Sequence, residues 1–148
     1  MKPLLAFSIL AILLSSSCKS ADKFTQFDLP YQAETTIPAA LGINLPFDLP
    51  TPAIKSNIEQ SYEVNNTRKS LIEEVSLKTL KLSIDEDDFD FLKKIKVFIN
   101  AEGLNEIEIA SKMEILDNQQ ILELDLNLDV NLMEYINKDQ FTLKVARY

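Results

Sequence analysis

The sequence contains no histidine and no tryptophan, and only two of its 148 residues are glycine. Without histidine, the chain cannot build a Ser-His-Asp or Cys-His catalytic centre, use imidazole as a general acid or base, or hold zinc through imidazole. Gly42 and Gly103 are too few for the glycine-rich loops that cradle phosphates. Without tryptophan, stacking on sugars is left to four tyrosines. These absences favour a protein that is not an enzyme and uses no cofactor.

Cysteine is also scarce, because Cys18 is the only one and the chain can form no internal disulfide. Before it come one basic residue, Lys2, an apolar run over residues 4–14, and three serines. This order is typical of a secretory signal peptide. The apolar run is shorter than the roughly 20 residues that span a bilayer. The N-terminus therefore predicts export.

The residues around Cys18 resemble the signal of bacterial lipoproteins, in which the cysteine is lipidated on sulfur and becomes the first residue of the mature chain. Ser16, Ser17 and Cys18 fit the pattern of that family. Ser15 stands where an aliphatic residue is usual, and Leu14 lies one position earlier. The resemblance implies a lipidation site at Cys18 and a membrane reached through lipid, without a transmembrane helix.

This resemblance covers only residues 1–18. It implies a bacterial cell envelope, and the outer membrane in particular, because Lys19 rather than an acidic residue follows the cysteine. An ordinary secretory signal cleaved near Ala21 is the alternative. The expected organisation is a signal peptide at residues 1–17, the lipidated cysteine and a tether at residues 18–26, and one domain over residues 27–148.

The charge of the chain is strongly unbalanced, with 15 basic and 23 acidic residues and a net charge of −8. Loss of Lys2 with the signal makes the mature chain more negative still. An acidic domain is repelled by nucleic acid and by anionic headgroups. We therefore expect no nucleic-acid binding, and we expect the lipid to hold the protein at the membrane.

Residues 24–57 are rich in proline and in apolar residues. They predict two or three short edge strands, because proline lacks the N–H that a central strand needs, and residues 61–64 predict another extended piece. The sequence Phe-Asp-Leu-Pro occurs twice, at residues 27–30 and 47–50. The apolar residues here form either the flank of the core, which we favour, or an exposed edge that accepts a partner strand: Phe27, Leu29, Leu45, Phe47 and Leu49.

Apolar and polar residues alternate with a period of two in five later segments, which predicts antiparallel strands with one polar face. In residues 75–84 the apolar side changes partway, which predicts a bulge or a crossing between sheets. Strands at this spacing predict an all-β domain, an antiparallel β-sandwich, with a barrel as the alternative. The other segments are residues 95–99, 106–110, 122–130 and 141–145. The predicted core includes Leu80, Leu82, Leu124, Leu126, Leu128, Phe141, Leu143 and Val145.

Two short helical insertions interrupt the strands. The first is expected at residues 89–94 with Asp88 as its N-cap, and the second at residues 132–137 with Asn131 as its N-cap. A further helical turn is expected at residues 68–73.

An acidic run at residues 85–88, with one more aspartate nearby, is the best candidate for a metal site. Calcium binds clustered carboxylates, and the candidate ligands are Asp85, Asp87, Asp88 and Asp90. The spacing is not that of an EF-hand, because no glycine follows and Phe89 occupies a ligand position. We favour a solvated turn that binds no metal, with Asp88 capping the helix that follows.

Three acidic residues alternate along the strand expected at residues 122–130, and they could suggest the paired carboxylates of a hydrolase: Glu123, Asp125 and Asp129. Neighbours on one face of a strand lie roughly 7 Å apart, so we favour a wet sheet face without catalysis. A small basic spot is expected to balance the acidic surface: Lys93, Lys94 and Lys96.

Together these features predict a non-enzymatic, lipid-anchored binding or accessory protein of the cell envelope, with an envelope protein as its partner. Residues 71–147 are similar in pattern to a sandwich domain of small bacterial lipoproteins of unknown function, a resemblance that carries no active-site motif. The alternative is a carrier that holds a lipid or another apolar ligand between two sheets.

Overall fold

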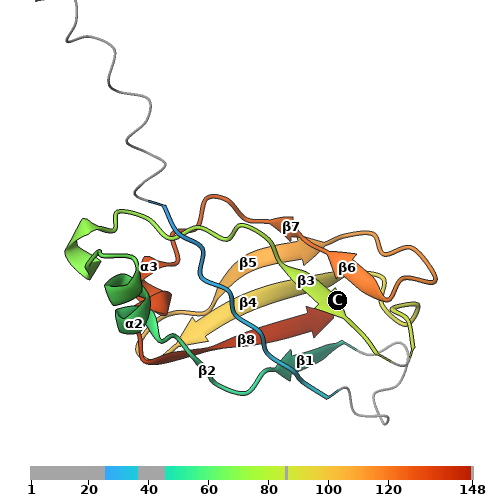
Figure 1. Cartoon of the computed structure of the whole chain (residues 1–148). Helices are drawn as coiled ribbons and strands as arrows, with labels where there is room; N and C mark the ends of the chain where they lie inside the picture. Colours follow the sequence, from blue (N-terminus) through green and yellow to red (C-terminus); the bar gives the residue numbers. More distant parts are fainter. Residues whose placement is uncertain (1–25, 37–45, 86, 148) are drawn as a thin grey trace, which may run out of the picture. The chain divides into compact units, whose positions relative to one another are not determined.

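Antiparallel strands make up most of the regular structure in the computed structural model, which describes residues 26–36, 46–85 and 87–147. One sheet has six strands, ordered β1-β8-β4-β5-β7 with β2 also paired to β8, and a second sheet pairs β3 with β6 (Figure 1). All pairings are antiparallel, as predicted. The strands are β1 Phe47–Pro50, β2 Ile54–Lys55, β3 Lys81–Ser83, β4 Ile95–Ala101, β5 Ile107–Lys112, β6 Ile121–Glu123, β7 Asp125–Leu126 and β8 Gln140–Arg147.

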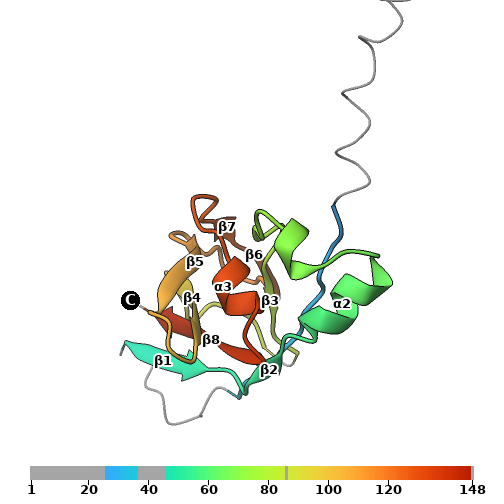
Figure 2. The same cartoon turned by 90° about the vertical axis from the view of Figure 1, so that its left-hand side faces the viewer.

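The chain divides into two units, residues 1–30 and residues 31–148. In the first unit, the described residues 26–30 have no regular secondary structure. In the second unit, the two-stranded sheet lies over one face of the six-stranded sheet, and the short helix α3, Met133–Ile136, lies at one end of the two sheets (Figure 2). Within the described residues, β1 and β7 do not pair with each other, so the six-stranded sheet does not close into a barrel.

The centre of the core lies on β4, which pairs along its whole length with β8. Ile95, Val97 and Ile99 point to the same side of the strand, because side chains alternate between the two faces, and all three are fully buried. Burying such a side chain contributes roughly 1.5–3 kcal/mol compared with leaving it exposed. The alternation predicted at residues 95–99 is therefore confirmed, and it supplies the most deeply buried strand.

A bulge in the pairing of β4 with β5 shifts the register between Val97 and Phe98. As a result, the consecutive residues Ile109 and Ala110 are both buried, although a regular strand would expose one of them. The crossing or bulge that the sequence predicts at residues 75–84 does not occur as expected. Only Lys81–Ser83 is a strand there, and residues 75–80 have no regular secondary structure.

The single strand predicted at residues 122–130 is two strands in different sheets. β6 pairs with β3, and β7 pairs with β5. The change of sheet falls at Leu124, which is buried and whose N–H donates to the Leu80 carbonyl at 3.0 Å. A turn at residues 128 and 129 follows β7 after one residue and leaves Leu128 71 % exposed. The predicted burial of Leu128 is therefore wrong.

The other predicted core residues are at least partly shielded from solvent. Leu124 and Phe141 are buried. Half-buried side chains make up the rest: Leu80, Leu82, Leu126, Leu143 and Val145.

One of the two predicted helical insertions is absent, and the other is present. Residues 89–94 form turns and no helix. The Asp88 carboxylate accepts the Asp90 N–H at 3.0 Å. This local hydrogen bond stabilises a turn, and no helix follows it. The predicted insertion at residues 132–137 is confirmed by α3, where the Asn131 side chain accepts the Met133 N–H at 3.0 Å.

A helix that the sequence analysis missed, α2, runs over Ile58–Val64, where an extended piece is predicted for residues 61–64. Ile58 and Tyr62 are both buried. Their spacing of four residues places them on one face of a helix. The turn expected at residues 68–73 is present in part as the 3-10 helix η3, Lys69–Leu71.

Candidate functional site

Residues 87–90 of the acidic run are tied into the fold by hydrogen bonds, and residue 86 lies outside the described residues. The Asp90 carboxylate accepts the N–H of Asn118, a residue in the left-handed region with φ of 62°. The Asp87 carbonyl accepts the Gln120 side-chain amide at 3.1 Å. Phe89 is buried, and its N–H donates to the Gln119 carbonyl at 2.9 Å. The turn therefore holds the connection between β5 and β6 in place.

Among the described residues, no group of three or more acidic or cysteine side chains could hold a metal ion. Two of the four predicted candidate ligands, Asp88 and Asp90, accept backbone N–H groups with their carboxylates. The structure thus gives these two carboxylates a structural role in the turn. That the turn binds no calcium stays a prediction.

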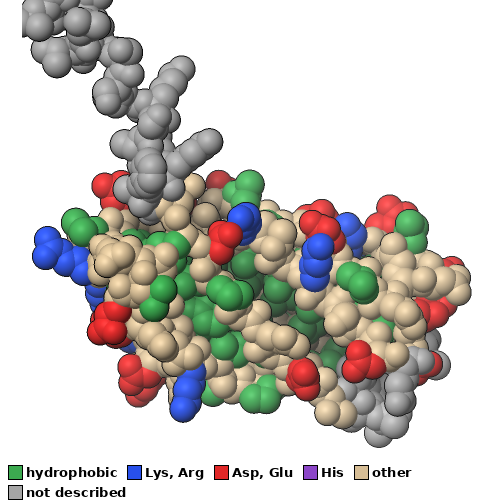
Figure 3. Space-filling view, viewed as in Figure 1, with side chains coloured by type: hydrophobic (Ala, Val, Ile, Leu, Met, Phe, Trp, Pro, Cys, Tyr) green, Lys and Arg blue, Asp and Glu red, His purple; other side chains and the backbone are tan. Residues whose placement is uncertain are grey.

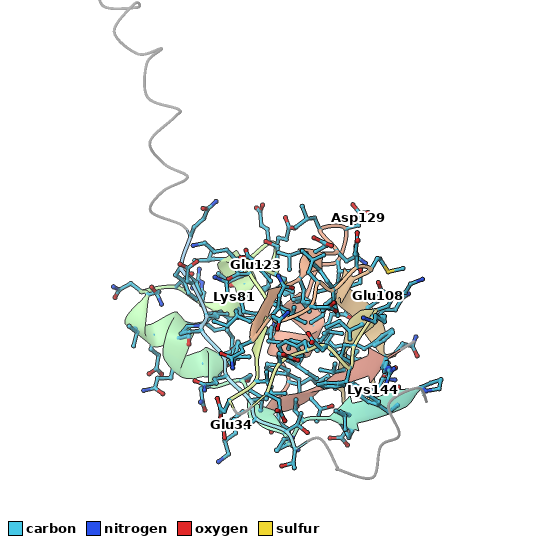
Figure 4. All side chains as sticks on the ribbon, turned by 90° about the vertical axis from the view of Figure 1, so that its right-hand side faces the viewer. Glu34, Lys81, Glu108, Glu123, Asp129 and Lys144 are labelled. Carbon is cyan, nitrogen blue, oxygen red and sulfur yellow. The ribbon has the colours of Figure 1, made fainter. Side chains whose placement is uncertain are left out.

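The row of carboxylates predicted along residues 122–130 is divided by the change of sheet. Glu123 lies on β6 and forms an ion pair with Lys81 at 3.7 Å. Asp125 lies on β7 and pairs with Lys112 at 3.7 Å. Asp129 lies in the turn beyond β7, where its N–H donates to the Asn127 side chain at 3.3 Å. Figure 4 shows Glu123 beside Lys81 and Asp129 well away from both. The structure therefore does not bring these carboxylates together.

The outer face of the six-stranded sheet carries a ladder of ion pairs across its strands. Lys144 on β8 contacts Asp48 on β1 at 3.8 Å and also Glu106, just before β5. Its Nζ also lies 4.9 Å from the centre of the Phe98 ring. Figure 4 shows Lys144 and Glu108 on the side of the domain opposite Glu123. This face resembles an ordinary solvated sheet surface in which opposite charges balance.

The basic spot predicted from three lysines is largely neutralised by acidic partners. Lys96 pairs with Glu108 at 2.7 Å, and Lys93 pairs with Asp117 at 3.5 Å. Lys94 is exposed. The pairs agree with the expectation of a balancing rim.

The apolar flank predicted near the N-terminus is buried where it forms a strand. Phe47 and Leu49 on β1 are buried, and β1 pairs with β8 in register from Phe47 opposite Arg147 to Pro50 opposite Lys144. Phe27 and Leu29 are half-buried. Leu45 lies outside the described residues.

The sequence analysis missed a set of exposed apolar residues that runs from the end of β5 to the first residue of β6. Three large side chains within nine residues face solvent, and we call them the apolar trio: Met113, 56 % exposed, Leu116, 62 %, and Ile121, 64 %. Single exposed apolar residues are common on protein surfaces, whereas a contiguous patch of them is typical of a binding surface. Ile115, which interrupts this run, is buried and fastens it to the core. The available sequence signal was a group of four large apolar residues within residues 113–121, which does not show which of them are exposed.

A polar hollow of about 540 Å³ lies between the turn after β4 and the turn between α3 and β8. Its lining includes Glu102, Lys138 and Asp139, and the amides of Asn100 and Asn137. Asn137 is already engaged, because its side chain accepts the Tyr62 hydroxyl at 3.0 Å and donates to the Met133 carbonyl at 2.7 Å. The hollow could take a small polar molecule, but it has no arrangement specific to one.

The predicted lipidation site, Cys18, and the signal and tether around it lie outside the described residues, apart from residue 26. In the part of the chain that the structure describes, no helix has the length and apolar character needed to cross a membrane.

Comparisons with protein-family models, with curated proteins and with solved structures give no match for this chain.

Proposed function

We propose that this chain is a non-enzymatic, lipid-anchored binding or accessory protein of a bacterial cell envelope, attached to the outer membrane through Cys18. Its domain is best regarded as an antiparallel β-sandwich in which the two-stranded sheet forms a small second layer. The apolar trio is the surface that binds an envelope protein. The proposed binding role requires no nucleic acid, metal or cofactor.

The observation that carries the proposal is the exposure of the apolar trio on a segment that is held in place. Hydrogen bonds from residues 87–90 fix the chain at Asn118, Gln119 and Gln120. Lys93 adds an ion pair to Asp117. A surface that is already ordered loses little conformational entropy when it binds, so more of the contact energy appears as affinity.

Catalysis by the carboxylates of β6 and β7 is less well supported than binding. Glu123 and Asp125 lie on different sheets, and each is paired with a lysine. A glycoside hydrolase needs two carboxylates on opposite sides of one substrate. This arrangement of Glu123 and Asp125 therefore supports a binding role better than a hydrolytic one.

The binding surface can be tested by photo-cross-linking in cells that make the native chain. A benzophenone amino acid at Leu116 should give one covalent adduct of defined mass with an envelope protein. The matched control is the same probe at Leu128, which is also largely exposed, at 71 %, but does not belong to the trio. Equal labelling of many proteins from both positions would argue against a specific surface.

A double substitution sharpens this experiment. Met113→Ser with Ile121→Ser removes apolar area next to the probe and should reduce the adduct at Leu116 at least tenfold, while the circular dichroism of the protein stays unchanged. An adduct that survives both substitutions would show that the trio is not the binding surface.

The anchor needs a separate test. Cys18→Ser should release the protein from the membrane fraction into the aqueous fraction, because the acyl chains supply about 0.8 kcal/mol per buried methylene. A Cys18→Ser protein that still resists aqueous extraction would show that the attachment is not through lipid on this cysteine.

A further inference from the structure

The connection between α2 and η3 forms a short tip that exposes apolar residues on an ordered backbone. Val64, the last residue of α2, is 73 % exposed, and Leu71, the last residue of η3, is 59 % exposed. We call residues 64–71 the α2–η3 tip; it lies at the left of Figure 1, to one side of the sheets.

The backbone of the tip is closed by a Schellman motif. Asn66 adopts φ of 51°, its N–H donates to the Glu63 carbonyl at 3.1 Å, and the Thr67 N–H donates to the Tyr62 carbonyl at 2.9 Å. The Leu71 N–H then donates to the Arg68 carbonyl at 2.9 Å. The tip is thus a preformed structure whose apolar side chains the fold does not use.

The tip also carries two basic residues in an acidic protein. Arg68 and Lys69 are exposed, and neither forms an ion pair among the described residues. Several lysines elsewhere do: Lys81, Lys93, Lys96, Lys112 and Lys144. The α2–η3 tip contains two basic residues and no acidic one, and exposed Glu63, Glu73 and Glu74 flank it, in a chain whose net charge is −8. Figure 3 shows basic and hydrophobic side chains at this end of the molecule, with acidic side chains beside them.

We infer that the α2–η3 tip, unlike the acidic domain as a whole, docks on an anionic lipid bilayer and orients the domain at the membrane. Val64 and Leu71 enter the boundary between headgroups and acyl chains, and Arg68 and Lys69 bind lipid phosphates while their stems lie along the apolar surface. The combination of exposed apolar and unpaired basic side chains matches an anionic bilayer better than it matches the apolar face of a protein. This inference rests on the proposed lipid anchor.

Because the lipid anchor already holds the domain at the membrane, a weak contact of the α2–η3 tip with the bilayer is enough for docking. A tether of about nine residues at roughly 3.3–3.6 Å each keeps the domain within about 30 Å of the membrane, so docking of the tip is intramolecular and its effective concentration is high. Each basic residue near an anionic surface should favour the docked state about fivefold, or about 30-fold for Arg68 and Lys69 together.

The test uses the full lipidated chain, isolated from membranes and reconstituted into vesicles. Because Cys18 is acylated, Leu71→Cys supplies the one free thiol, which is labelled with an environment-sensitive fluorophore. In vesicles containing about one third phosphatidylglycerol, we expect several-fold weaker quenching by aqueous iodide than in vesicles of pure phosphatidylcholine. The matched position is Leu128→Cys, next to Asp129, where quenching should be strong in both vesicles.

Charge reversal tests the basic pair itself. Arg68→Glu with Lys69→Glu should lower the ratio of docked to undocked protein by at least about 30-fold and restore iodide quenching at position 71. Lys55→Glu with Lys94→Glu changes the net charge by the same amount at exposed sites outside the tip and should leave quenching at position 71 low.

The outcomes separate the inference from the proposed anchor. If the chain floats with the vesicles but position 71 is quenched as strongly as position 128, the tip does not dock and the anchor stands. If the chain does not float with the vesicles, the anchor is wrong and the inference falls with it.

Discussion

The two strands β6 and β7 come from one alternating stretch of sequence, yet this stretch buries its apolar residues to very different degrees in the two sheets that it joins. Residues 122–130 run from one sheet into the other and show the contrast in a single segment. Leu122, on the two-stranded sheet, is 1 % exposed. Leu126 on the six-stranded sheet is half-buried, and Leu128 beyond it is exposed. Alternation therefore identifies a strand, but the layer above the strand decides whether its apolar side is buried.

The largest expected effect tests this contrast by truncating the leucines one at a time. Leu122→Ala should lower the free energy of unfolding by about 2–5 kcal/mol, because it opens a cavity in a fully packed site. Leu126→Ala should cost about 1–2 kcal/mol, and Leu128→Ala less than about 0.5 kcal/mol. Denaturant unfolding of the Cys18→Ser protein measures all three. Equal losses of unfolding free energy in Leu122→Ala and Leu128→Ala would show that the two leucines are not buried to different degrees.

A smaller effect distinguishes the ion pairs of the two sheets. Lys96 and Glu108 on the six-stranded sheet are half-buried and 2.7 Å apart, whereas Lys81 and Glu123 on the two-stranded sheet are exposed and 3.7 Å apart. Double-mutant cycles should give a coupling of about 0.5–1 kcal/mol for the first pair and about 0.2 kcal/mol or less for the second. Added salt should reduce the first coupling only partly. A stronger coupling between Lys81 and Glu123 would reverse the expected order.

The smallest effect concerns pH at the end of the six-stranded sheet where α2 meets α3. Burial raises the pKa of Tyr62 above its ordinary value of 10.0, the Glu59 carboxylate raises it further, and the hydrogen bond to Asn137 lowers it. Because the folded chain holds this proton more tightly than the unfolded chain, the stabilisation is complete below pH 10 and is lost as the pH rises through the folded-state pKa.

Unfolding measured between about pH 8 and about pH 11 checks this expectation. Stability should fall above about pH 10, and Tyr62→Phe should reduce the slope while removing the hydrogen bond to Asn137. An unchanged slope in Tyr62→Phe would show that another group controls the alkaline loss.

Much of the strand arrangement could be predicted from the sequence because alternation is a local signal. Ile95, Val97 and Ile99 show it without interruption, and the strand there is confirmed. Sheet identity is not local, so the change of sheet at Leu124 could not be read from residues 122–130. It depends on the Leu80 carbonyl, which lies far away in sequence and accepts the Leu124 N–H.

The errors in helix prediction have a different cause. The prolines before residue 53 favour an extended backbone, and the prediction extended this conformation to residues 61–64. Ile58 and Tyr62, however, have the spacing of residues on one face of a helix. At residues 89–94, the Asp88 side chain and the buried Phe89 and Leu92 are equally compatible with a helix and with consecutive turns. The apolar trio escaped notice because exposure depends on what covers a residue, and the sequence does not give that.

The central claim is that Cys18 anchors a binding protein that carries no ligand inside its domain. Native mass spectrometry of the protein, gently extracted from membranes, tests both parts at once. We predict a chain that begins at Cys18 and carries covalent acyl chains there, with no further bound lipid. A chain cleaved near Ala21 without lipid would contradict the anchor, and a stoichiometric non-covalent lipid would contradict the binding role in favour of a carrier.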